Sequence, residues 1–369
     1  MGRFLEWCGR EAVERPWRLI AGSALVAAIS FGFGLKVVVD NHLAELAPKG
    51  SEVLDTNRVL DEELGGMIGI QFDLLGEPGV FHREETLRAL HEVELQLGED
   101  PIARMVQGPG GAIAYGSFTL GGPVRVPSQE IVDRVLSRHG DGALSRVIGP
   151  EGGRGLINLS SRDPGALAFD EATDRMLPLV EEAVAPFGVE VVPTGTSWVA
   201  YRGINAIAED LRASLFIAFL IVTLLVGLLF RSVRLALISI PPNALPLLMG
   251  YGFMGMVGLE LEPPTAVVFT LALGIAVDDT IHLLARYREE RRRGVPPKAA
   301  TSEALRRCGV AVTVTSLLLT MGFWVNTLSG FPTTVALGSL GAVVIASAWI
   351  CDLLLLPPLL VLFGEKSED

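Results

Sequence analysis

The sequence predicts an α-helical membrane protein with six transmembrane helices and an α+β domain between the first helix and the second. Half of the 369 residues are hydrophobic, and the mean hydropathy is +0.44. The apolar residues gather in six runs, each close to or above the ~20 residues that span a hydrocarbon core. A polar segment, residues 40–210, separates the first run from the second. The runs lie near Leu19–Leu35, Leu215–Phe230, Leu235–Val257, Thr265–Leu284, Val310–Leu328 and Val335–Phe363.

The distribution of Lys and Arg predicts the orientation in the membrane. Basic residues precede the first run, follow the second and cluster between the fourth and fifth, whereas the turns near Glu260–Glu262 and Ser329–Pro332 carry none. Basic loops stay in the cytoplasm, so both termini are expected there, with the polar segment outside, as in a bacterial inner-membrane protein. The first run is long for a signal peptide and lacks a small-x-small cleavage site, which favours an anchor. The expected domains are therefore residues 1–39, 40–210, 211–364 and a tail, 365–369.

The outer segment alternates strand-like and helix-like patterns. Two β-α-β units of this size predict a ferredoxin-like α+β sandwich. Gly-rich motifs at Gly108–Gly111 and Gly152–Gly153 are predicted to be turns. A last helix, from about Arg202, is expected to continue into the second span. The predicted strands are Met67–Leu75, Ile102–Val106, Gly155–Ser160 and Val189–Pro193, and the helices Arg83–Leu97, Gln129–Arg138 and Phe169–Phe187.

Charge and motif content exclude several classes of function. Residues 40–210 carry 28 acidic and 13 basic side chains, a net charge of −15, which argues against a nucleic-acid partner. Neither a GxxxxGK[ST] phosphate loop nor a GxSxG nucleophile motif is present. The sequence therefore predicts no enzyme and no cofactor, and any energy for transport would come from an ion gradient.

Cysteine and histidine spacing predicts no metal site. The cysteines Cys8, Cys308 and Cys351 all fall in or beside the membrane, so no disulfide is expected outside. Four histidines are scattered through the outer segment without ligand spacing and are predicted to be surface residues: His42, His82, His91 and His139.

Proline and glycine residues mark candidate packing or hinge positions in the spans. Pro241, Pro242 and Pro246 predict a kink or partial unwinding of the third span, where Asn243 and Ser239 could bond the backbone groups that prolines release. Small residues let helices approach closely. Tight packing without a moving part explains them as well as a hinge does. The candidates are Gly274, Pro241, Pro242, Asn243, Gly338 and Gly341.

The segment GIAVDDTIH, Gly274–His282, places ionisable side chains inside an apolar span. Such groups cost at least ~2.5–3.5 kcal/mol each, and they usually mark ion or proton pathways. Asp278 and Asp279 lie four and three residues before His282 and can share a helix face. Asp352 in the sixth span is expected at a similar depth, roughly 15 Å from the inner surface. These four residues form a candidate proton relay. The alternative is structural: Asp279, His282 and Arg286 form an internal ion pair, and Asp352 a stabilising contact.

Several motifs together resemble the resistance-nodulation-division superfamily, in its branch of lipid exporters related to mycobacterial membrane protein large, hopanoid-transporter and Patched-like proteins. The motifs are GIAVDDTIHLLARYRE (Gly274–Glu289), GVAVTVTSLLLTMGF (Gly309–Phe323), LSGFPTTVALGSLGA (Leu328–Ala342) and the segment Val37–Gly66. The resemblance implies proton-driven export of lipids or other hydrophobic compounds through an outer porter domain. It also implies that spans two to six form a bundle like a sterol-sensing domain, with proton-relay acids at Asp278 and Asp279.

The chain departs from the family pattern in two ways. Relatives often carry Asp-Tyr where this sequence has Asp278 and Asp279. The family is also typically built from two tandem halves, and this chain matches one. Either it is a fragment, or it works as a homo-oligomer or with a second half-transporter, in contact with the bilayer and a hydrophobic substrate. The alternative function is a non-transporting, lipid-sensing or accessory membrane subunit.

Overall fold

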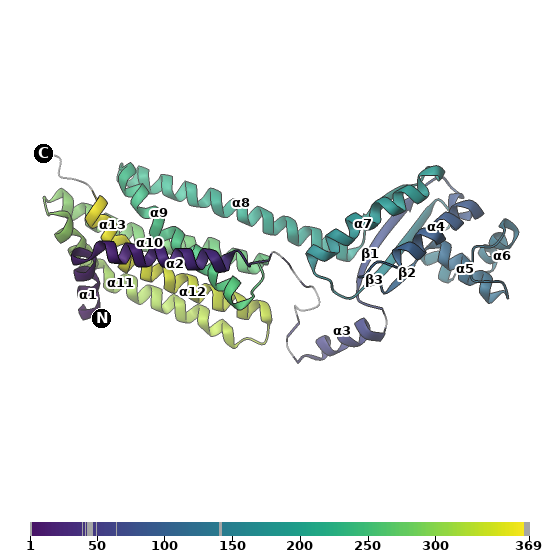
Figure 1. Cartoon of the computed structure of the whole chain (residues 1–369), viewed down its shortest axis with the longest axis horizontal. Helices are drawn as coiled ribbons and strands as arrows, with labels where there is room; N and C mark the ends of the chain where they lie inside the picture. Colours follow the sequence, from purple (N-terminus) through teal and green to yellow (C-terminus); the bar gives the residue numbers. More distant parts are fainter. Residues whose placement is uncertain are drawn as a thin grey trace. The chain divides into compact units, whose positions relative to one another are not determined.

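A computed structural model describes residues 2–38, 40, 42, 47–48, 50–63, 65–139 and 142–364 (Figure 1). The chain forms two compact units. The membrane unit comprises Met1–Val39 and Ile207–Asp369, and the outer unit comprises Asp40–Ala206. The long helix α8, Thr196–Phe230, belongs to both units.

Six helical segments of the described chain are long and apolar enough to cross a membrane, which confirms the predicted number. Four of these six spans begin with proline. Its fixed φ suits the first helical position, and its missing N–H costs nothing there. A short amphipathic helix, α1, precedes them and packs on α11. The helices are α1 Gly2–Glu14, α2 Pro16–Gly34, α8, α9 Val233–Val257, α10 Pro263–Arg292, α11 Pro297–Val325, α12 Pro332–Leu354 and α13 Leu356–Phe363.

Helix α10 lies among α9, α11 and α12, and α12 also packs against α9 and α11 (Figure 1). Two of the candidate packing residues, Gly338 and Gly341, allow α12 to pack closely on α11. A Cβ atom at Gly341 would lie 2.2 Å from the Phe323 ring, and one at Gly338 would lie 2.7 Å from the Phe323 carbonyl oxygen. Gly274 differs, because a Cβ there would meet no described atom within 4 Å. Gly338 and Gly341 therefore seat α12 on α11, whereas Gly274 makes no close helix contact.

The proline-rich third span is one continuous helix, so the expected unwinding is not found along α9. Pro241, Pro242 and Pro246 all lie inside it. The Asn243 Nδ2 group donates a 2.8 Å hydrogen bond to the Ser239 carbonyl, and the Ser239 hydroxyl donates to the Ala236 carbonyl. These side chains bond carbonyls of their own helix, which offsets part of the backbone bonding that proline removes.

The sixth span consists of two helices rather than one. Helix α12 ends at Leu354 and α13 begins at Leu356, with the break at Leu355. Pro357 and Pro358 follow immediately and have no N–H to continue the α12 hydrogen-bond ladder. The break therefore falls three residues after Asp352.

The outer unit holds a four-stranded antiparallel sheet in the order β2-β3-β1-β4. Helices α4 and α7 pack together and, with the sheet, bury an apolar core that includes Phe72, Leu90 and Phe169. The left-handed Gly195, with φ of 101°, separates β4 from α8. The elements are α3 Glu52–Glu63, β1 Ile68–Leu75, α4 Glu84–Leu97, β2 Met105–Gln107, α5 Pro109–Thr119, α6 Gln129–His139, β3 Arg154–Ser161, α7 Ala166–Val184 and β4 Glu190–Thr194, with short 3₁₀ turns that include η3 Ala143–Arg146.

One prediction for the outer unit is wrong. The motif Gly108–Gly111 is not a turn but opens helix α5, with Pro109 as its first residue. A Cβ at Gly110 would lie 2.3 Å from the His91 amide nitrogen, so this glycine lets α5 press directly on α4. The glycines therefore serve close helix packing, a use that looks the same as a turn in sequence.

Candidate functional site

The first acidic group of the membrane unit lies between α10 and α11. Asp279 is 9% exposed, and its Oδ2 accepts a 2.9 Å hydrogen bond from the Ser316 hydroxyl of α11. The close packing of α10 on α11 directs this carboxylate into the helix interface. One hydrogen bond leaves most of the acceptor capacity of a carboxylate unused, so the group retains a position for a proton.

The second acidic group lies between α9, α10 and α12. Asp352 is 1% exposed, and its Oδ1 accepts a 2.6 Å hydrogen bond from the Thr280 hydroxyl. Thr280 Oγ1 also lies 3.3 Å from the Asn243 Oδ1 atom of α9. The Asp352 Oδ2 atom is buried and has no hydrogen-bond partner among the described residues. An unpaired carboxylate oxygen in this position is costly, and a proton on it would remove the charge.

Asp278 and His282 lie on a different face of α10, which is open in the single chain. The His282 Nε2 and Asp278 Oδ1 atoms are 3.6 Å apart, and the side chains are 65% and 74% exposed, respectively. Both border a cavity of about 410 Å³ between α10 and α11, which also reaches Asp279 and Thr315. The cavity therefore connects the exposed pair with the buried Asp279.

The structure thus divides the four predicted relay residues into three positions. Asp278 and His282 share the open face, Asp279 faces α11, and Asp352 faces Thr280, the residue after Asp279. Two hydroxyl partners, Thr280 and Ser316, were not identified from the sequence. Thr280 follows the two aspartates directly and could have been found by position, whereas Ser316 carries no signal in an apolar run.

The described residues do not form the alternative ion pair of Asp279, His282 and Arg286. Arg286 pairs with Glu289 and Glu290, three and four residues further along α10. His282 pairs with Asp278 only. The arginine therefore belongs to a charged cluster at the end of α10, and no ion pair joins it to Asp279 within the described part of the chain.

Glu94 of α4 is a buried carboxyl group of the outer unit. Its Oε1 accepts a 3.0 Å hydrogen bond from the Gly110 amide and its Oε2 a 2.5 Å bond from the Gly111 amide. Burial raises the pKa of Glu94 to about 7, although the two amide hydrogen bonds lower it in part. The side chain occupies the first turn of α5, where unpaired amides and the helix dipole favour a carboxylate.

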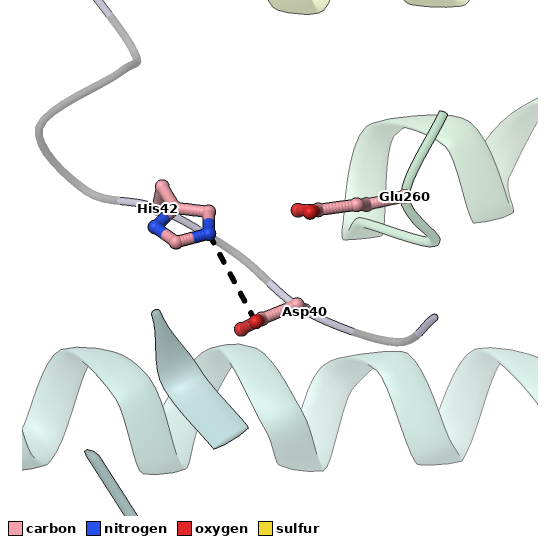
Figure 2. A group of neighbouring side chains, drawn as sticks. All are labelled: Asp40, His42 and Glu260. Carbon is pink, nitrogen blue, oxygen red and sulfur yellow. Dashed lines mark ion pairs between the residues drawn. The ribbon is translucent and has the colours of Figure 1, made fainter. Parts of the chain in front are cut away.

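His42 of the outer unit is half-buried between acidic groups, so its prediction as a plain surface residue is incomplete. Its Nε2 lies 3.9 Å from Asp40 Oδ2 (Figure 2), and its Nδ1 lies 3.5 Å from Asp163 Oδ1. Asp163 also accepts a hydrogen bond from the Tyr201 hydroxyl. His82 and His91 are likewise half-buried, and the side chain of His139 lies outside the described residues.

Six apolar helices with carboxylates inside the bundle define a polytopic membrane protein. The model of the MMPL family matches residues 142–368. The chain belongs to this family, and it is 30% identical over 194 residues to the membrane protein MJ1562 of Methanocaldococcus jannaschii, an alignment of 53% of this chain and 49% of that protein. The chain spans about half the length of this relative.

Parts of the chain are also similar to two longer proteins. Protein patched homolog 1 of Danio rerio is 35% identical over 127 residues, 34% of this chain and 10% of that protein. Multidrug resistance protein MdtC of Yersinia enterocolitica is 28% identical over 209 residues, 56% of this chain and 19% of that protein. The resemblance to the resistance-nodulation-division superfamily, in its mycobacterial-large and Patched-like branch, is therefore confirmed.

Proposed function

We propose that the protein is a secondary transporter that exports lipids or other hydrophobic compounds, driven by proton entry. Asp278, Asp279, His282 and Asp352 carry the proton in this proposal. The observation that supports it most is the 1%-exposed Asp352, whose Oδ2 atom has no described partner. A carboxyl group that is buried and incompletely paired binds a proton readily.

The exposed face of α10 leads to a proposal about assembly. Asp278 and His282 would face lipid in a single chain, at a cost of at least ~2.5–3.5 kcal/mol for each charged group. A second copy of the chain, or a second half-transporter, would cover this face and enclose the 410 Å³ cavity. The acids of both subunits would then share one interior, where repulsion between carboxylates favours partial protonation.

The proposed location and architecture follow from charge and topology. We place the chain in the cytoplasmic membrane with both termini inside, because the basic loops fall on the same side of the membrane as the termini. The outer unit is proposed to be a ferredoxin-like porter domain. The antiparallel strand order β4-β1-β3-β2, with α4 after β1 and α7 after β3, supports this assignment.

The test is efflux of Nile red, a hydrophobic dye, from energised cells that express the chain. We expect faster efflux than in empty cells, and a protonophore should abolish the difference. The Asp279→Asn variant should lose at least tenfold in rate while its membrane level stays unchanged. The Asp174→Asn variant changes an exposed outer carboxylate and should behave as the wild type. Faster efflux that is unaffected by both the protonophore and Asp279→Asn would refute proton coupling. Efflux no faster than in empty cells would favour the non-transporting, lipid-sensing alternative.

A further inference from the structure

A second cavity lies entirely inside the outer unit, between β2, α5 and the 3₁₀ turn η3. Its volume is about 470 Å³, within the range of roughly 300–1,000 Å³ that is typical of small-molecule sites. Val106, Ala112, Leu144 and Val147 form apolar walls, and Tyr115 and Arg146 supply polar groups. It is separate from the cavity beside Asp279.

The way α5 packs leaves this side of the helix uncovered. The Gly110 backbone presses on α4, and the Glu94 carboxyl group holds the amides of the first turn. The first turn of α5 is thus fixed from the α4 side, while Ala112 and Tyr115 border the cavity. The cavity therefore borders a helix whose first turn is held in place, which suits a preformed binding site.

Aromatic surface continues beyond the rim of the cavity. Tyr115 is 64% exposed, and its ring lies 6.3 Å from the ring of Phe118, which is also exposed. Large exposed apolar groups next to a pocket are typical of surfaces that bind other molecules. An apolar chain longer than the cavity could therefore extend over these rings.

The charge at the cavity selects one class of ligand. Arg146 is exposed, and its guanidinium group makes no ion pair or hydrogen bond with any residue that the structure describes. It is one of only 13 basic side chains in a segment with 28 acidic ones. A guanidinium group binds a carboxylate or phosphate with two parallel hydrogen bonds, so a cation beside apolar walls matches an anionic amphiphile.

We propose that this cavity binds the apolar tail of an acidic amphiphile whose carboxylate or phosphate headgroup pairs with Arg146. The inference rests on the proposed export function and specifies its substrate class. The site would hold the compound in the outer unit, on the far side of the membrane from the basic loops.

The test is equilibrium binding of tritiated laurate to the full-length chain in a neutral detergent. Dodecyl phosphate should displace laurate, whereas dodecyltrimethylammonium, with the same tail and a positive headgroup, should not. Arg146→Gln should weaken laurate binding at least tenfold, and Ala112→Trp, which fills the cavity, should abolish it. Arg138→Gln changes an exposed arginine of α6 outside the cavity and should bind as the wild type does.

Several results would overturn the site. Equal displacement by the positively charged amphiphile would refute the headgroup contact, and unchanged binding in Arg146→Gln would refute the role of this arginine. Because Arg146 is exposed, Arg146→Gln remains a fair test even if Ala112→Trp fails to fold. If the anionic competitor dodecyl phosphate fails to displace bound laurate, phosphate is excluded and the headgroup is a carboxylate. The assay needs no proton gradient, so Asp279→Asn should bind laurate normally, which separates failure of this site from failure of transport.

Discussion

The Thr280 hydroxyl donates a 2.6 Å hydrogen bond to Asp352, and the same oxygen lies 3.3 Å from Asn243 Oδ1. This contact joins three helices, α9, α10 and α12, at one point inside the membrane unit. Thr280 directly follows Asp278 and Asp279 on α10, so the residue after the paired aspartates bonds the single aspartate of α12. We therefore expect Thr280 to affect the function of both acidic positions, if they act as the proposed relay.

Removal of the Thr280 hydroxyl should lower the thermal stability of the protein and slow its proton-coupled efflux. Thr280→Val preserves shape but leaves Asp352 with no described partner, at a cost of about 1–3 kcal/mol for an unsatisfied buried group. The thermal midpoint in detergent should fall, and protonophore-sensitive dye efflux should slow several-fold. Thr223→Val is the matched control, because that hydroxyl bonds only its own helix at the Phe219 carbonyl. Equal behaviour of the two variants would show that the contact is dispensable.

The exposed face of α10 should be buried in an assembly. Leu271 is 51% exposed and lies seven residues before Asp278, two turns along the same side of the helix. Leu271→Cys, in a Cys308→Ala background, should form a disulfide-linked dimer on mild oxidation in membranes. Leu224→Cys, in α8 and 62% exposed, should stay monomeric on a denaturing gel. Dimers of both variants at equal yield would indicate random collision, and no dimer of either would contradict self-assembly through this face.

The stability of the outer unit should depend on pH through Glu94. Its folded pKa of about 7 lies above the ordinary value of 4.5, so the folded chain keeps a proton that the unfolded chain loses. The free energy of unfolding should therefore fall as the pH rises from about 4.5 to about 7, by at most about 3 kcal/mol.

Hydrogen exchange of the slowest amides in β1 and β3 would measure this dependence. Glu94→Gln keeps an acceptor for the α5 amides but does not titrate, so its opening free energy should stay flat over the same range. A wild-type curve parallel to that of Glu94→Gln would show that folding does not raise the pKa of Glu94.

Glycines in the membrane unit should respond in opposite ways to the same substitution. Gly341→Ala would place a Cβ 2.2 Å from the Phe323 ring, and such overpacking typically costs about 1–3 kcal/mol. Gly274→Ala meets no described atom within 4 Å and should be neutral or stabilise α10 by roughly 0.5–1 kcal/mol. Thermal unfolding in detergent would compare the two, and a loss of stability in Gly274→Ala would reveal a partner at that surface.

The sequence predicted most strands and helices of the outer unit, but it did not predict that a Gly-Pro-Gly-Gly segment begins a helix. β1, α4 and α7 lie within a few residues of their predicted bounds, because their alternating or helical apolar patterns are local. Helix α5 was missed because its first turn reads as Gly-Pro-Gly-Gly. The amides of that turn are bonded by Glu94, sixteen and seventeen residues earlier in the chain. A contact of that kind leaves no local pattern.

The number of spans and the presence of ionisable groups within them were determined by the sequence alone, because hydropathy and charge are properties of each segment by itself. Which acids meet was decided only by tertiary structure. Adjacent on one helix, Asp278 and Asp279 project about 100° apart, so one lies on an open face while the other bonds Ser316 of α11. The partners of Asp279 and Asp352 come from other helices, and only the packing of the bundle brings those atoms within hydrogen-bond distance.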